Sequence, residues 1–413
     1  MMTRRVLLRG SAIVMAGSGM SPAWLARAAG AGDKTAKRKI LIAIFQRGAA
    51  DGLNIVAPFG DKRYRELRPT LAVAAPTTGQ TANGLGQFSS IDLDGYFALH
   101  PQMQALKPLW ERKQVAFVQA AGSPDPSRSH FDAQEFMESG TPGKSLGDGW
   151  LNRALAPADD KTSPVRAIAL SSELPRTLRG SRAAIAVNDA QQFQMGDQQS
   201  ASILERMYAQ SASKDLSRTG TDAFAAIKTI KTVNQQPYNP AGGAQYFQGG
   251  ELGRSLQQIA RLIKADVGVE AAFAEMGGWD HHGNEAGQMG NMLGQFSRAI
   301  AAFSQDMGDR MEDIVMVTMS EFGRTAQENG DGGTDHGHGG VMMVFGGPVQ
   351  GGKVYGKWPG LEKEQLFEGR DLAVTTDYRE VLGELVIQHM GAKNLGDVFP
   401  GYQPGPGLGL LKV

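Results

Sequence analysis

The chain has 413 residues, 41% hydrophobic and 20% charged, which is enough to bury the core of one large domain or two closely associated ones. Its 42 basic residues balance 42 acidic residues, so no overall positive field is present to hold a nucleic acid or an anionic membrane surface, and we expect neither partner. The sequence contains no cysteine, so disulfides are excluded and any bound metal must be held by histidines and carboxylates.

The first residues are typical of an export signal. Paired arginines (Arg4-Arg5) precede a modestly apolar stretch at about residues 11–25 and a small-residue cleavage site, Ala26-Arg27-Ala28. This order predicts a twin-arginine signal peptide over residues 1–28 and a mature protein that is periplasmic or extracellular; an ordinary helical N-terminus is the alternative. No later segment approaches about 20 continuous apolar residues, so we expect no membrane span in the mature protein.

Along the mature chain, β-rich apolar runs alternate with helical patterns. Between two of these runs, apolar residues at helical spacing predict a helix over Asn291–Met311. Strand, helix and strand in that order indicate a parallel α/β sheet within one domain over residues 38–413, with ligands at the carboxyl ends of the strands. The predicted strands are Lys39–Phe45, Gln114–Gln119, Val165–Leu170, Val267–Phe273, Asp313–Met319 and Val341–Phe345.

Residues 180–262 differ in composition, being rich in Gln, Ala, Ser and Asp, and they predict a helical insertion able to cover the site. Toward the C-terminus, Thr376–Met390 predicts a closing helix and Phe399–Gly409 a surface tail. Within the insertion, the helical patterns are Ile203–Tyr208, Ala223–Val233 and Leu252–Ile263, with a loop over Gln235–Gly250.

Ser129 lies at the start of a predicted helix that follows the second strand. As an N-cap its hydroxyl would lie at the positive end of the helix, where an anion is favoured. Beside a divalent metal, Ser129 is a candidate nucleophile toward a phosphoryl or sulfuryl group; the alternative is that it only caps the helix. The next residue, His130, is either a proton donor to a leaving group or an ordinary surface histidine.

Four of the seven histidines lie in two segments of the last third of the chain where Asp and His stand beside glycines. Such loops at strand ends carry the oxygen and nitrogen ligands of metal sites; a hydrogen-bonded polar network is the alternative. We expect one histidine of the pair at 281 and 282 to bind metal, and Asp335 either to bind metal or to orient a ligand. Arg324 and Arg47 are each either an anion clamp or half of an ion pair. The candidate metal ligands are Asp51, Asp280, His281, His282, Glu321, Asp335, His336 and His338.

Several long motifs carry a resemblance to a known family. They are Phe45–Asn54, Ser129–Asp132, Gly278–Asp280, Ser320–Thr325, Gly333–Gly340 and Gly346–Val349. Over essentially the whole mature chain, the sequence resembles the bacterial domain-of-unknown-function family 1501, exported proteins allied to sulfatases. More distantly it resembles the alkaline phosphatase and sulfatase superfamily. This resemblance implies an alkaline phosphatase-like three-layer α/β fold, with a mostly parallel sheet, helices on both faces and one or two metals at the strand ends.

The resemblance also suggests roles. Asp51 resembles the first metal carboxylate and Ser129 the helix-capping nucleophile. Asp280 with His281 or His282 resembles the Asp/His pair on one metal, Glu321 the later carboxylate, and His336 or His338 the final histidine. The chain departs from the superfamily pattern at Asn284 and Phe322, where histidines are usual, and Ser129 lacks the small-residue context of a phosphatase nucleophile.

These observations lead to a functional expectation. We expect an exported hydrolase that cleaves phosphate or sulfate esters of small molecules or glycans by in-line displacement. Mixed His and carboxylate ligands favour Zn, Mn or Fe over Ca, as one or two ions. The alternative is a non-catalytic envelope or secreted protein that keeps the fold to bind a glycan or a co-secreted partner. A metal-independent serine esterase is disfavoured because no Gly-x-Ser-x-Gly motif follows a strand.

Overall fold

The computed structural model describes residues 38–77, 89–144, 146–159, 162–187, 207, 210 and 214–412. The predicted signal peptide over residues 1–28 lies outside the described residues, as does nearly all of the predicted helix over residues 203–208. Among the described residues, no helix combines the length and the apolar character needed to cross a bilayer.

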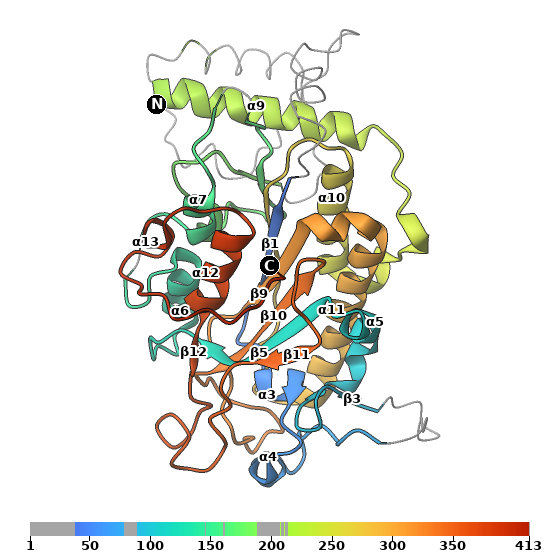
Figure 1. Cartoon of the computed structure of the whole chain (residues 1–413), viewed down its shortest axis with the longest axis vertical. Helices are drawn as coiled ribbons and strands as arrows, with labels where there is room; N and C mark the ends of the chain where they lie inside the picture. Colours follow the sequence, from blue (N-terminus) through green and yellow to red (C-terminus); the bar gives the residue numbers. More distant parts are fainter. Residues whose placement is uncertain are drawn as a thin grey trace.

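A nine-stranded mixed sheet forms the centre of the molecule, in the order β11-β5-β10-β9-β1-β8-β6-β7 with β12 beside β5 (Figure 1). Only β10 runs antiparallel to its neighbours, β5 and β9, and the other pairs are parallel. The predicted class, an α/β fold with a mostly parallel sheet, is therefore confirmed. The strands are β1 Ile40–Gln46, β5 Val115–Gly122, β6 Ala167–Ala169, β7 Ile185–Ala186, β8 Ala271–Met276, β9 Ile314–Met319, β10 Gly340–Gly346, β11 Lys353–Tyr355 and β12 Thr376–Asp377.

Helices cover both faces of this sheet, because the alternating residues of β1 face two separate apolar cores. Ile40, Ile42 and Ile44 lie in a core with η1, α5, α10 and α11. Leu41, Ala43 and Phe45 lie in a second core with α6, α7, α12 and α13. The result is the predicted three-layer arrangement. The helices are η1 Pro101–Leu106, α5 Lys107–Glu111, α6 His130–Ser139, α7 Trp150–Ala154, α10 Gly250–Lys264, α11 Glu285–Met307, α12 Tyr378–Gln388 and α13 Leu395–Val398.

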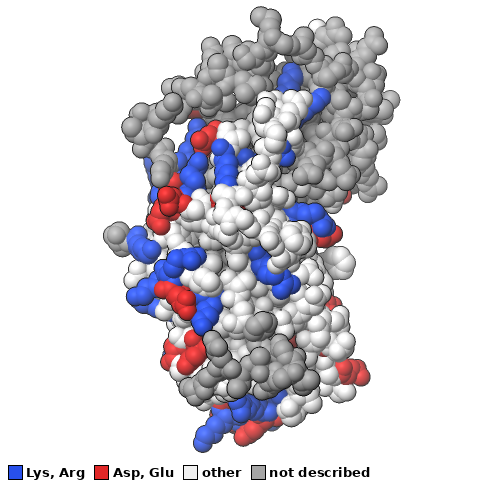
Figure 2. Space-filling view, turned by 90° about the vertical axis from the view of Figure 1, so that its right-hand side faces the viewer, with Lys and Arg blue, Asp and Glu red and all other residues white. Residues whose placement is uncertain are grey.

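Shorter elements complete the fold. A three-stranded sheet, β2-β4-β3, lies beside the helices that follow β1. These elements are α3 Gly52–Ile55, β2 Val56–Ala57, α4 Lys62–Leu67, β3 Ile91–Asp92, β4 Ala98–Leu99, η2 Arg176–Leu178, α9 Lys214–Asn234, η3 Ala241–Gly243, η4 Tyr246–Gly249 and η5 Gly308–Asp313. On the face drawn in Figure 2, basic and acidic side chains are interspersed over the described surface, as the equal charge counts would suggest.

Two predicted elements have different boundaries in the structure. The fourth strand begins at Ala271 instead of Val267, because the chain first turns through Asp266 and Gly268, which have positive φ angles of 51° and 90°. The crossover helix begins earlier than predicted, at Glu285, and ends at Met307, after which η5 continues toward β9. Glycines in its first turns interrupt the apolar pattern on which the prediction depended.

The predicted insertion contains α9 and α10, separated by a segment with two short 3-10 helices where a loop was predicted. Leu256 and Ile259 of α10 lie in the same core as β1, so this helix belongs to the layer that packs on the sheet. The insertion as a cover over the site stays a prediction.

The C-terminal part has the predicted closing helix, α12, capped by the Asp377 side chain, which accepts from the Arg379 N–H. The surface tail is exposed along most of its length but is anchored at its start. Phe399 is fully buried and stacks on Trp150 with ring centroids 6.0 Å apart. The prediction was wrong at this residue, because a large aromatic ring among prolines and glycines still gains by burial.

Candidate metal centre

Four loops and one helix start meet at one edge of the sheet. Parallel strands β1, β8 and β9 end there. Because β10 is antiparallel to β9, β10 starts at the edge where β9 ends. The segment Gly333–Gly339, which leads into β10, therefore lies at the same edge. The isolated bridge between Arg324 and His336 joins this segment to the loop after β9. The start of α6, after β5, supplies His130.

Close backbone contact holds these loops together. At Gly48, which has φ +117°, a Cβ atom would lie 2.7 Å from the Asp280 backbone nitrogen. At Gly323 it would lie 1.9 Å from the Gly339 carbonyl oxygen. Any side chain at either position would force the loops apart, so glycine is required for the approach.

Three imidazoles and one carboxylate converge at this edge. The Nε2 atom of His336 lies 3.0 Å from Nε2 of His130 and 3.1 Å from Nε2 of His282. It also lies 3.1 Å from Asp280 Oδ1, which is 2.9 Å from His282 Nε2. We call His130, His282, His336 and Asp280 the histidine cluster. Their side chains are 26–47% exposed, so solvent and small solutes reach them.

The opposite nitrogen of each ring fixes the tautomer. Nδ1 of His130 lies 2.8 Å from Glu321 Oε1, and Nδ1 of His282 lies 3.0 Å from Asp335 Oδ1. Nδ1 of His336 lies 3.1 Å from the Arg128 carbonyl oxygen. These partners, a carbonyl and two ionised carboxylates, only accept, so each Nδ1 carries the hydrogen and each neutral ring presents an Nε2 lone pair to the cluster.

Lone pairs that face one another at about 3 Å need a positive charge between them. Burial and the neighbouring His130 lower the pKa of His336, whereas the hydrogen bond to Glu321 raises the pKa of His130. The positive charge is therefore either a proton on one of the rings or a bound cation. Among the described residues, one atom each from His130, Asp280 and His336 forms a group within 4.8 Å that could hold a metal ion. Nitrogen-rich donors with one carboxylate fit a transition metal.

Glu321 orients His130 through a set of converging donors. Besides the imidazole, its Oε1 accepts from the Gly48 N–H at 2.9 Å and from Gln134 Nε2 at 2.8 Å. Its Oε2 accepts from Ser320 Oγ at 3.1 Å. Although burial acts to raise it, these hydrogen bonds lower the pKa of Glu321, which stays ionised.

Arg324 orients Asp280. The arginine is 1% exposed, and its Nη1 donates to Asp280 Oδ1 at 2.6 Å while Nε and Nη2 donate to Thr334. Burial acts to raise the pKa of Asp280, but the guanidinium of Arg324 acts to lower it, and the net shift of this pKa is downward. The placement favours the ion-pair interpretation of Arg324 over an anion clamp, because its donors are already engaged. Arg47 likewise pairs with Glu138 and Glu275.

Asp51, the candidate ligand after β1, lies in a separate buried group. Arg68 donates to both of its carboxylate oxygens, and the two residues are 2% or less exposed. Burial and the charge of Asp51 raise the pKa of nearby Glu285 to about 8, so Glu285 is protonated at neutral pH. We call Asp51, Arg68 and Glu285 the Asp51 cluster. No described contact joins it to the rings of the histidine cluster, and Asp51 as a metal ligand stays a prediction.

Three other predicted site residues lie apart from the converging rings. His281 is 3% exposed, and its Nε2 has no hydrogen-bond partner among the described residues. His338 is buried and stacks on Phe367, with ring centroids 4.3 Å apart. Burial lowers the pKa of both histidines. Ser129 caps α6 by accepting from the Asp132 N–H at 3.5 Å, and its role as a nucleophile stays a prediction.

Residues 38–398 match the family described as "Protein of unknown function (DUF1501)". The chain belongs to this family. The function of this family is unknown. No curated protein matches the chain.

Solved structures similar to this DUF1501 protein include Ps i-CgsB in complex with k-i-k-neocarrahexaose, at 12% identity and a TM-score of 0.37 over 87% of this chain and 73% of that one. A second is a protein in the alkaline phosphatase superfamily from Vibrio parahaemolyticus, at 10% identity and a TM-score of 0.32 over 77% of this chain and 62% of that one. A third is the alkaline phosphatase from the Antarctic bacterium TAB5, at 11% identity and a TM-score of 0.30 over 76% of this chain and 93% of that one. Likenesses of this size concern the arrangement of the chain only.

Sequence reasoning about this DUF1501 chain missed several residues of the site. His130 was predicted to be either a proton donor or an ordinary surface histidine, and was not among the candidate metal ligands, whereas its ring is one of the three that converge. A signal was available, because His130 and Gln134 are four residues apart on a predicted helix and therefore share one face. Arg68, Glu285 and the Arg128 carbonyl carried no such signal, since they belong to segments without ligand motifs.

Proposed function

We propose that this protein is a metal-dependent hydrolase of phosphate or sulfate esters. The observation that carries the proposal is the convergence of three Nε2 atoms and one carboxylate oxygen, each imidazole being held from behind by an acceptor. Such second contacts are what orient the ligands of protein metal sites. When bound, a divalent ion would supply Lewis acidity toward the oxygens of an ester.

The donor set limits the metal. His130, Asp280 and His336 would hold it, with His282 beside them, and three of these four donors are imidazole nitrogens. Imidazole suits Zn, Mn and Fe, whereas Ca prefers oxygen ligands. We therefore propose Zn, Mn or Fe.

Ser129 is the proposed nucleophile. Its two chain neighbours both contact the histidine cluster, Arg128 through its carbonyl oxygen and His130 through its ring. Its side chain is exposed at the N-terminus of the ten-residue helix α6, where peptide N–H groups favour the developing negative charge of an oxyanion. Attack by Ser129 Oγ on the phosphorus or sulfur atom would release the alcohol, and water would then cleave the resulting ester of Ser129.

The test begins with elemental analysis of the purified mature protein and of Asp280→Ala, His336→Ala and His338→Ala. We expect transition metal in the wild type, its loss in the first two variants and its retention in His338→Ala, the matched control whose ring stacks on Phe367. Hydrolysis of aryl phosphates and aryl sulfates should then follow the metal content and be lost in Ser129→Ala. A folded, metal-free wild-type protein would sink the proposal.

A binding protein without catalysis is the second candidate. The observation that favours it is Phe322, whose ring lies 5.0 Å from that of His130 and 5.1 Å from that of His336, at a position where the superfamily pattern has a histidine. An apolar ring there cannot ligate a second ion. Bound metal with no hydrolysis of any ester, in wild type and Ser129→Ala alike, would support this candidate.

Export remains a proposal as well. We propose that residues 1–28 direct the folded protein through the twin-arginine route to the periplasm or beyond. Replacement of Arg4 and Arg5 by lysine should leave the precursor in the cytoplasmic fraction, and normal processing of that variant would contradict the proposal.

A further inference from the structure

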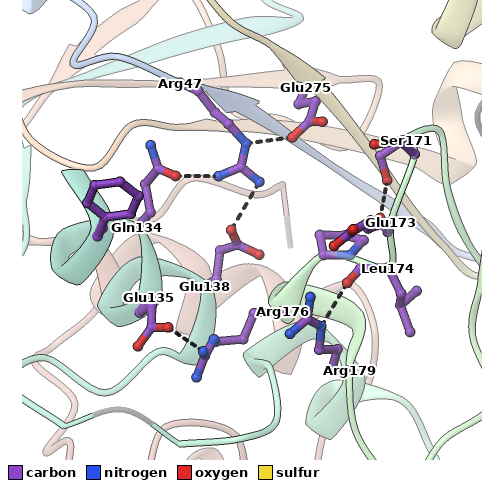
Figure 3. Close-up of a pocket in the computed structure, with 13 residues that line it drawn as sticks. Arg47, Gln134, Glu135, Glu138, Ser171, Glu173, Leu174, Arg176, Arg179 and Glu275 are labelled. Atoms are coloured by element: carbon purple, nitrogen blue, oxygen red, sulfur yellow. Dashed lines mark hydrogen bonds and ion pairs between the residues drawn. The ribbon is translucent and has the colours of Figure 1, made fainter. Parts of the chain in front are cut away.

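A cavity of about 390 Å³ lies beside α6, between the ends of β1 and β8 and the segment after β6 (Figure 3). Arg47 and Glu275 form one side of it, Gln134 and Glu138 of α6 a second, and Arg179 a third. The volume is near the lower end of the roughly 300–1,000 Å³ that small-molecule sites occupy. It suits a group of monosaccharide size.

The cavity adjoins the histidine cluster through α6. Gln134 lines the cavity, and its Nε2 donates to the same Glu321 oxygen that holds the ring of His130. The Gln134 carbonyl oxygen in turn accepts from Arg47 Nη1 at 3.0 Å. Phe131, which directly follows His130, also lines the cavity and is 88% exposed. A molecule bound here would therefore have one end close to the histidine cluster.

The charges of the lining compensate one another. Three arginines and four glutamates line the cavity. Arg47 pairs with Glu138 and Glu275, and Arg176 pairs with Glu135. An anionic or cationic ligand would therefore have to compete with existing ion pairs. Neutral hydroxyl groups, in contrast, can leave these ion pairs in place, because each carboxylate oxygen that accepts from Arg47 keeps a further lone pair for a second hydrogen bond.

We infer that this cavity binds the hydroxyl-rich, uncharged part of the substrate, a sugar ring that carries the ester group. The inference rests on the proposed function and names its substrate class. Guanidinium, carboxylate and amide groups would hydrogen-bond the sugar hydroxyls. The exposed ring of Phe131 would cover the apolar C–H face of the sugar, a contact that no other lining side chain supplies as an aromatic surface.

The test uses saturation-transfer NMR on the metal-loaded full-length mature protein with methyl glucoside, methyl galactoside and methyl N-acetylglucosaminide. Methylammonium and acetate, whose C–H protons the method detects, serve as cationic and anionic comparators. At least one sugar should bind, and Phe131→Ala should weaken it by about fivefold, the loss expected for one aromatic contact. Phe131→Tyr should bind normally. So should Phe247→Ala, a matched control at another phenylalanine that is 75% exposed.

Absence of binding by all three sugars would overturn the inference, as would equal affinity in Phe131→Ala or binding of methylammonium or acetate in their place. The readout separates this inference from the proposed function. Sugar binding that depends on Phe131, in a protein that hydrolyses no ester, would support the cavity as a sugar site and contradict the proposed hydrolase function. Hydrolysis of an aryl sulfate at equal rates in wild type and Phe131→Ala, without sugar binding, would do the reverse.

Discussion

The Asp51 cluster and the histidine cluster are both polar groups near the carboxyl ends of strands, but they differ in how completely their polar atoms are compensated. Asp51 is buried against Arg68, which supplies a permanent cation. The histidine cluster is partly exposed. Its carboxylate, Asp280, is also paired with a buried arginine, Arg324, but the lone pairs of its three rings face one another with no arginine or lysine of the described residues between them. A carboxylate after a strand therefore indicates a polar site, whereas ring lone pairs that remain uncompensated favour a metal.

The largest expected effect comes from removing the internal cation. Arg68→Leu leaves Asp51 buried and unpaired, which should lower the free energy of unfolding by about 3–5 kcal/mol. Arg63→Ala, which removes an arginine one third exposed and paired with Glu66, should cost less than about 1 kcal/mol. Urea denaturation measures both. Metal content should not change in Arg68→Leu; its loss would merge the two clusters into one site and break the comparison.

A second variant sharpens the other side of the comparison. Glu321→Gln keeps the size of the side chain but removes the charge that holds Nδ1 of His130, so metal affinity should fall by about 10–100-fold, or about 1.4–2.7 kcal/mol. Competition with a chromophoric chelator measures the affinity. Unchanged affinity would mean that Glu321 only tethers the loop after β9.

The Asp51 cluster makes its own contribution to the pH dependence of stability. Burial and Asp51 raise the pKa of Glu285 from 4.5 to about 8, so between these values the folded protein binds a proton that the unfolded chain has lost. This contribution is fully present below pH 4.5 and declines as the pH rises toward 8, with a slope of up to about 1.4 kcal/mol per pH unit. Glu285→Gln should flatten the slope in denaturation curves between pH 5 and pH 8, within the window set by those pKa values. An unchanged slope would assign it to other groups.

The smallest effect is expected at the exposed rim of the histidine cluster. Asp335, which holds Nδ1 of His282, is 57% exposed, so water replaces it more readily than it replaces buried Glu321. Asp335→Asn should weaken metal binding by less than about tenfold in the same chelator assay. A loss of metal affinity equal to that of Glu321→Gln would show that solvent exposure of the carboxylate does not determine how much each contact contributes.

The sequence predicted where the site lies better than it predicted which residues form it. Strand ends are visible as apolar runs that stop at Asp, His and Gly, so the segments around Asp280 and His336 were found. The choice within each histidine pair was not predictable, because it depends on backbone contacts between loops. His281, for example, donates its N–H to the Trp279 carbonyl, and its ring is buried.

Other features depend on contacts between segments far apart in the chain. Arg68 follows a short helix and carries no motif, yet it reaches the Thr325 carbonyl as well as Asp51. Short strands such as β7 and β12 have too few residues for a period-2 pattern, so pairing with a longer neighbour defines them. Helices α10 and α11 were predictable because their apolar faces repeat over several turns.

The single antiparallel strand has a consequence for how the protein is made. His336 lies four residues before the start of β10, and β10 pairs with both β5 and β9, so we expect this histidine to reach its place only when both neighbouring strands have formed. His130, 206 residues earlier, leaves the ribosome long before its partner exists. The nascent chain therefore cannot complete the histidine cluster until about four fifths of it has been synthesised, and a shortened translation product that ends before His336 would carry His130 without ever completing the cluster.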